Sequence, residues 1–156
     1  MELLYLKLSR VKALVIGFLV CIISPLNAQD LGVDFATDYS IVPLGSVPNL
    51  PTSYGGLTFK LGDPNTLLIG GGANQASGRI YEIALTRDVD DHITGFSGLA
   101  TPIGDVGENN DGGVTYGPGG VLFTTRYPVN QLGQTPFGDT DEQRVDDLGP
   151  FGVTGR

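Results

Sequence analysis

The chain has 156 residues, of which 24 are glycine and 10 are proline, with one cysteine, one histidine and no tryptophan. Its formal charge is −8, and because an acidic surface repels nucleic acid, no nucleic-acid partner is expected. A single histidine excludes a histidine-rich zinc site. The lone Cys21 lies near the N-terminus, so the rest of the chain has no disulfide and no thiolate chemistry.

Residues 1–28 have the pattern of a secretory signal peptide. A flank with three basic residues precedes the apolar run 13–23, Pro25 follows that run, and cleavage is expected after Ala28. The run is shorter than the roughly 20 apolar residues of a spanning helix, so no stable membrane span is expected after cleavage. Three of the 9 basic and one of the 17 acidic residues fall in this leader, which leaves residues 29–156 with a net charge of −10. The expected location is secreted, periplasmic or at the cell surface.

Short apolar runs separated by glycine and proline continue through residues 29–156, a pattern typical of many short strands joined by turns. Residues 41–44 are expected to form a short extended piece at a sheet edge, because Pro43 cannot donate to a ladder. Strands are then predicted at 57–60, 66–70, 79–86 and 93–101. The continuous apolar stretch 67–69 suits burial on both faces, whereas 79–86 alternates polar and apolar residues as a half-buried strand does.

A five-residue phrase occurs twice in the sequence. Gly-Gly-Leu-Thr-Phe at 55–59 returns as Gly-Gly-Val-Thr-Tyr at 112–116, and an apolar residue followed by glycine precedes each copy, at 44–45 and at 103–104. A third such pair stands at 148–149. Self-similarity at a fixed interval predicts a repeat architecture.

The second unit starts in the same order as the first. Strands are predicted at 114–116 and 121–126, a loop at 127–134, and a late strand at 144–148 after a polar stretch with little strand signal. Four antiparallel strands in about 45 residues match one propeller blade. The predicted fold is therefore all-β, with antiparallel blade-like four-stranded repeats at about 41–101 and 102–148. Together they would make a partial, truncated β-propeller; the alternative is a β-sandwich with two similar hairpins.

Residues 38–134 resemble secreted bacterial β-propeller proteins of largely unassigned function. The residues that carry the resemblance are 54–59, 62–67 (Gly-Asp-Pro-Asn-Thr-Leu), 110–114 (Asn-Asp-Gly-Gly-Val) and 117–120 (Gly-Pro-Gly-Gly). Such proteins often end in an anchoring tail with a Pro-Glu-Pro motif, and this sequence contains no such motif. A closed propeller has 4 to 8 blades, so two blades are expected to be incomplete, with open strand edges that favour self-association.

The candidate site residues lie on the loops of one rim, because loops on a rigid scaffold carry function. This rim comprises the loops that enter each first strand and those that join second to third strands. The predicted ligand-binding residues are Tyr54, Asn74, Gln75, Arg126 and Asn130. The predicted metal ligands are Glu108, Asn110 and Asp111, whose hard oxygens suit calcium, the one cofactor that the sequence suggests. An ordinary polar turn is the alternative for that loop.

A second acidic group at 88–91 fails the EF-hand pattern, because Ile93 stands where the loop needs glycine, and it is predicted to be a solvated hairpin turn. His92 has no catalytic partner in the sequence. The favoured function is thus an exported binding or surface-associated module without catalytic activity of its own. The alternative is a fragment of a propeller enzyme of the lactonase, lyase or sugar dehydrogenase type. A metal-dependent version of that enzyme would use Glu108, Asn110 and Asp111.

Overall fold

The computed structural model describes residues 31–153, so the predicted signal peptide lies outside the described residues. The chain divides into two compact units, Met1–Val42 and Pro43–Arg156. In the first unit, the backbone N–H of Phe35 donates to the carbonyl of Gly32 at 2.9 Å, and the rings of Phe35 and Tyr39 meet edge-on with centroids 6.3 Å apart. Within the described range, no helix is both long and apolar enough to cross a membrane.

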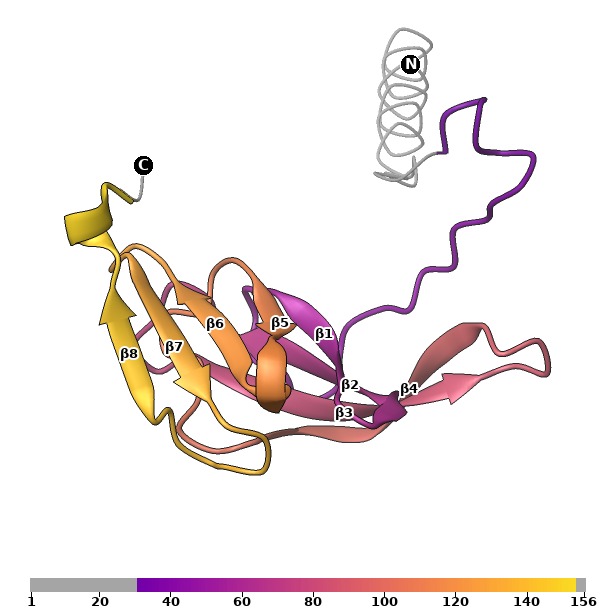
Figure 1. The fold of residues 1–156 in the computed structure, drawn as a ribbon. Coiled ribbons are helices and arrows are strands. Elements are labelled where there is room, and N and C mark those ends of the chain that lie inside the picture. Colours follow the sequence, from indigo (N-terminus) through magenta and orange to yellow (C-terminus); the bar gives the residue numbers. More distant parts are fainter. Residues whose placement is uncertain (1–30, 154–156) are drawn as a thin grey trace, which may run out of the picture. The chain divides into compact units, whose positions relative to one another are not determined.

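The second unit is built from two antiparallel four-stranded sheets, which Figure 1 shows in magenta to pink and in orange to yellow. Sheet 1 contains β1 (Leu57–Lys60), β2 (Asp63–Gly71), β3 (Arg79–Arg87) and β4 (Ile93–Pro102). Sheet 2 contains β5 (Val114–Tyr116), β6 (Leu122–Arg126), β7 (Gln131–Thr135) and β8 (Arg144–Asp147). The 3₁₀ turns η1 (Pro118–Gly120) and η2 (Gly149–Phe151) are short. In each sheet the strands follow chain order, which confirms the predicted all-β class with four-stranded antiparallel repeats.

Burial of β2 on both faces is confirmed. Side chains alternate between the two faces of a strand, and Leu67 and Ile69 join one apolar cluster while Leu68 between them joins another. The first cluster fills one face of sheet 1 and includes Val47 and Leu50 from the segment before β1. The second lies between the two sheets. The predicted extended piece at 41–44 is not a strand.

The predicted loop at 127–134 is wrong in its second half, where the structure places β7. Its sequence, Gln-Leu-Gly-Gln-Thr, has one apolar side chain and a glycine, so it gives almost no strand signal. The glycine is required by packing: a Cβ atom on Gly133 would collide with the side chains of Glu142 and Thr124. Tertiary packing thus overrides local propensity here.

The linker between the sheets, residues 103–107, is built into both of them. The N–H of Ile80 in β3 donates to the carbonyl of Val106 at 2.7 Å, and Ile103 donates back to Ile80 at 3.0 Å. On the other side, Asp105 donates to Thr140 of the β7–β8 loop at 2.8 Å. An apolar layer of Leu68, Ile80, Val106, Val114 and Leu122, each at most 7% exposed, lies between the sheets. The two sheets therefore share one core layer and a hydrogen-bonded connection.

Candidate functional site

The structure brings three of the predicted rim loops together. The N–H of Asn109 donates to the carbonyl of Gln75 at 2.9 Å, and the carbonyl of Asn109 accepts from Tyr127 at the same distance. The loop before β5 is thereby joined to the β2–β3 loop on one side and to the β6–β7 loop on the other. Asn109 adopts the left-handed backbone conformation, with φ of 53°, which asparagine tolerates better than most residues. The rim is a continuous hydrogen-bonded edge.

The predicted ligand-binding residues differ in how open they are. Asn74 and Gln75 are exposed at the β2–β3 loop, and Tyr54 is 45% exposed while its hydroxyl accepts from the N–H of Val47 at 3.2 Å. Asn130 is half-buried. The side chain of Arg126 is only 10% exposed. Tyr54, Asn74 and Gln75 are therefore the exposed members of the set.

Asn110 is fully buried at the junction of the two sheets. Its amide nitrogen donates to the carbonyls of Gly71, Arg79 and Gly107 at 3.2, 3.3 and 2.7 Å. Its Oδ1 atom has no hydrogen-bond partner among the described residues. A Cβ atom on Gly55 or on Gly70 would collide with that oxygen, so both glycines leave room for it. This side chain connects sheet 1 to the entry of sheet 2.

Glu108 and Asp111, the other predicted metal ligands, lie in different surroundings from Asn110. The carboxylate of Glu108, 43% exposed, is ion-paired with Arg126 at 3.1 Å, and Asp111 is half-buried. Any ion on this loop would compete with Arg126 for Glu108. Calcium binding here stays a prediction.

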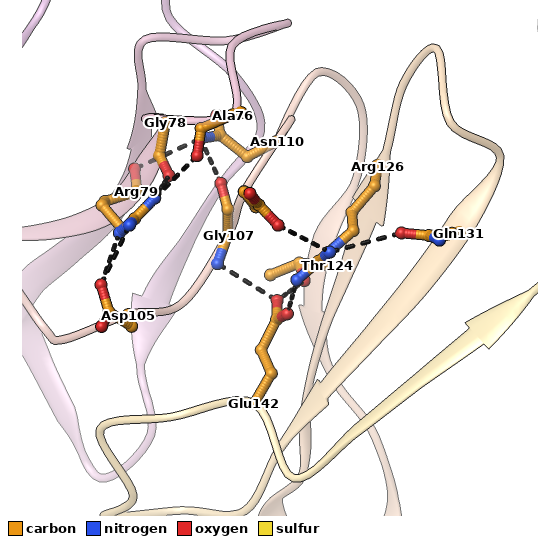
Figure 2. Close-up of polar contacts among 11 residues, drawn as sticks. Ala76, Gly78, Arg79, Asp105, Gly107, Asn110, Thr124, Arg126, Gln131 and Glu142 are labelled. Carbon is orange, nitrogen blue, oxygen red and sulfur yellow. Dashed lines mark hydrogen bonds and ion pairs between the residues drawn. The ribbon is translucent and has the colours of Figure 1, made fainter.

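A buried ion pair stands beside Asn110, as Figure 2 shows. Glu142 from the β7–β8 loop is 4% exposed and is paired with Arg126 at the end of β6. Its Oε1 atom also accepts from the N–H of Gly107 at 3.1 Å and from the hydroxyl of Thr124 at 2.9 Å. Arg126 in turn donates to Gln131 at 3.3 Å. A buried carboxylate is tolerated only when its oxygens are satisfied in this way.

Of the residues in this cluster, Arg126 is among the predicted site residues, whereas Glu142 and Thr124 are not. The available signal was the polar Thr124 on the face of β6 that buries Leu122, together with Gly133 in the neighbouring strand. A buried threonine opposite a glycine indicates that a polar group from elsewhere enters the sheet face. Nothing in the sequence says which of the acidic residues does so.

A cleft of about 460 Å³ opens between the sheets at the end opposite the rim. Its apolar wall includes Leu68, Leu122 and Tyr116, and its polar wall includes Lys60 and Glu82, which form an ion pair at 2.6 Å. The Glu82 carboxylate, through this hydrogen bond, raises the pKa of Lys60. The sequence did not predict this cleft.

The acidic turn after β3 is a solvated hairpin turn, as predicted. The carboxylate of Asp88 accepts from the N–H groups of Asp90 and His92 at 3.0 and 2.9 Å, and these hydrogen bonds, chiefly the one from His92, lower the pKa of Asp88. Potential ligand atoms of the three side chains lie within 4.8 Å of one another, and all three residues are exposed. The hydrogen bonds account for the turn.

No protein-family model matches this chain, and comparisons with curated proteins and with solved structures give no match.

Proposed function

We propose that this chain is an exported binding module of the β-propeller type, whose sheets are blades and whose rim contacts a neutral, hydroxyl-rich ligand such as a surface polysaccharide. The observation that carries the proposal is the hydrogen-bonded rim, in which loops from both sheets present side-chain amides on a fixed framework. It favours binding because a rigid scaffold lowers the entropy lost when a ligand is immobilised.

The blade assignment is supported by the repeat of strand order and of the linker. Each sheet is preceded by an apolar-glycine pair, and the first strands of the two sheets, β1 and β5, contact one another. In a β-propeller the blades are arranged around a common axis, so the first strands of neighbouring blades lie next to one another.

The ligand class is supported by the chemistry of the rim. Asn74, Gln75, Asn130 and Gln131 offer amides, each of which donates and accepts hydrogen bonds. The charge of Arg126 is already neutralised by Glu108 and Glu142, and the strongly acidic chain disfavours an anionic ligand. Hydroxyl groups fit such a surface better than phosphates or carboxylates do.

The test is titration of the exported protein with neutral polysaccharides by calorimetry. Replacing Gln75 by Ala should weaken binding, whereas Gln143→Ala, which removes an exposed amide from the β7–β8 loop at the opposite end of the sheets, should leave it unchanged. Equal loss in both variants, or no binding by the wild type, would overturn the proposal.

A further inference from the structure

The packing of sheet 1 on sheet 2 provides a template for a second contact. One face of sheet 1, through Leu68 and Ile80, packs on the linker residue Val106 and on the β5–β6 face of sheet 2. Leu68 and Ile80 are 2% and 0% exposed. The same positions can be found in sheet 2 from the strand register.

The register places Phe123 and Leu132 where sheet 1 has Leu68 and Ile80. In sheet 1 Leu68 pairs with Thr58, and in sheet 2 Phe123 pairs in the same way with Thr115. Likewise, Ile80 pairs with Gly70 in sheet 1, and Leu132 pairs with Thr125 in sheet 2. Because Leu122 and Thr124 point toward sheet 1, the alternation of side chains directs Phe123 to the other face. We call this the outward face of sheet 2.

The outward face of sheet 2 is less covered than its counterpart in sheet 1. Phe123 and Leu132 are each half-buried, whereas their counterparts are fully buried. Leu68 pairs with the charged Glu82 in sheet 1, and its counterpart Phe123 pairs with Gln134 in sheet 2. The uncharged Gln134 therefore takes the place of Glu82. The face thus combines two apolar side chains with Arg144 and Asp146 of β8, which pair in register with Gln134 and Leu132 and form an ion pair with each other at 2.8 Å.

The opposite face of sheet 1 has the matching pattern. Leu57 pairs with Ile69 as Val114 pairs with Thr124, and Phe59 pairs with Leu67 as Tyr116 pairs with Leu122. Leu57 and Phe59 are 59% and 45% exposed, while Val114 is 7% exposed beneath sheet 1. We call this, with the segment before β1, the entry face of sheet 1.

The segment before β1 completes the correspondence. Leu-Gly-Ser-Val at 44–47 corresponds to Ile-Gly-Asp-Val at 103–106, and Val47 is buried against sheet 1 as Val106 is buried against sheet 2. The entry face therefore carries the linker on which a preceding sheet would pack.

We propose that the outward face of sheet 2 binds the entry face of sheet 1 of a second copy of this chain, in the arrangement that sheet 1 and sheet 2 have within one copy. The internal ion pair between Arg79 and Asp105 has as its counterparts the uncharged Gln131 and Ser46, and the charges of Arg144 and Asp146 on the outward face are already paired with each other. The contact joins two different faces, so it is head-to-tail and forms either a closed ring or an open chain. Rings of two to four copies would contain the 4 to 8 sheets of closed propellers. This contact goes beyond the proposed ligand binding and does not depend on it.

The experiment is sedimentation of the exported full-length mature protein over a range of concentrations. We expect oligomers, with Phe123→Asp and Leu57→Asp each reducing association because each places a charge on one of the two faces. Val89→Asp is the matched control, since Val89 is fully exposed on the β3–β4 turn, and it should associate as the wild type does.

Mixing the two variants gives the decisive measurement. The Phe123→Asp copy keeps an intact entry face and the Leu57→Asp copy keeps an intact outward face, so an equimolar mixture should form one-to-one dimers and nothing larger. Circular dichroism establishes that each variant is folded, and Leu57→Ser and Phe123→Ser replace any that is not. A wild type that remains monomeric at all concentrations, or oligomers unchanged by both variants, would overturn the proposal; the second result would point to strand-edge pairing instead.

Discussion

A Cβ atom at Gly70 would collide with Oδ1 of Asn110, although the two residues belong to different sheet units and stand 40 positions apart in the sequence. The glycine in β2 and the asparagine before β5 thus form a single packing unit. Their contact shows that the second sheet is inserted into sheet 1 at its entry loop and does not merely lie beside it.

Replacing Asn110 by Ala should destabilise the fold strongly. The change removes an amide whose two N–H groups serve three carbonyls, and leaving buried carbonyls without that partner typically costs about 1–3 kcal/mol. The free energy of unfolding from urea titration measures the effect. Gln75→Ala, on an exposed neighbouring loop, is the control and should change it by less than about 0.5 kcal/mol. An unchanged urea midpoint in the Asn110 variant would contradict this role.

Gly133→Ala should also destabilise the protein, by about 1–3 kcal/mol as for other overpacked sites, because the new methyl group would displace Glu142 and Thr124. Gly113→Ala is a matched control, since a Cβ atom there meets nothing within 4 Å. It should be neutral or slightly stabilising, through reduced entropy of the unfolded chain. Thermal unfolding of both variants separates the two cases, and equal shifts would show that Glu142 does not occupy this space.

The carboxyl group of Asp63 provides a test at acid pH. The hydroxyl of Thr66 and then the N–H of Asn65 donate to it and hold its pKa below the ordinary value of 3.8. A lowered pKa gives stability that is present above pH 3.8 and is lost as the pH falls through the folded-state pKa. Thr66→Val should raise the pKa of Asp63 in an NMR titration. The same rise in a Thr94→Val control would refute the assignment to Thr66.

The ion pair in the cleft should act at alkaline pH. Glu82 raises the pKa of Lys60 above 10.5, so the associated stability is complete below pH 10.5 and is lost as the pH rises through the folded-state pKa. Both side chains are more than one third exposed, so the pair is worth at most about 1 kcal/mol. Glu82→Gln should lower the pKa of Lys60, measured by NMR of its side chain. A pKa that does not move would mean that the pair is absent in solution.

The sequence was informative where local pattern and tertiary packing agree. The apolar run at 67–69 predicted a strand buried on both faces. The structure agrees, because a different apolar cluster covers each face of that strand. At β7 the two disagree, because Gly133 leaves the space that the Glu142 side chain occupies, and no local preference of the sequence reveals that. Asn110 was predicted as an ion ligand from the chemistry of its side chain alone. Its burial could not be predicted, because it depends on glycines 32 to 55 positions away in the sequence.

The hydrogen-bonded linker has a consequence for how such a chain can grow. Residues 103–106 pack on sheet 2 as residues 44–47 pack on sheet 1. Each repeating unit therefore begins with the apolar-glycine pair of its linker and ends with the last strand of its sheet, β4 or β8. The junction between Pro102 and Ile103 is then the natural boundary for duplication. A segment inserted at that boundary would carry its own linker and would leave the entry face of sheet 1 and the outward face of sheet 2 unchanged.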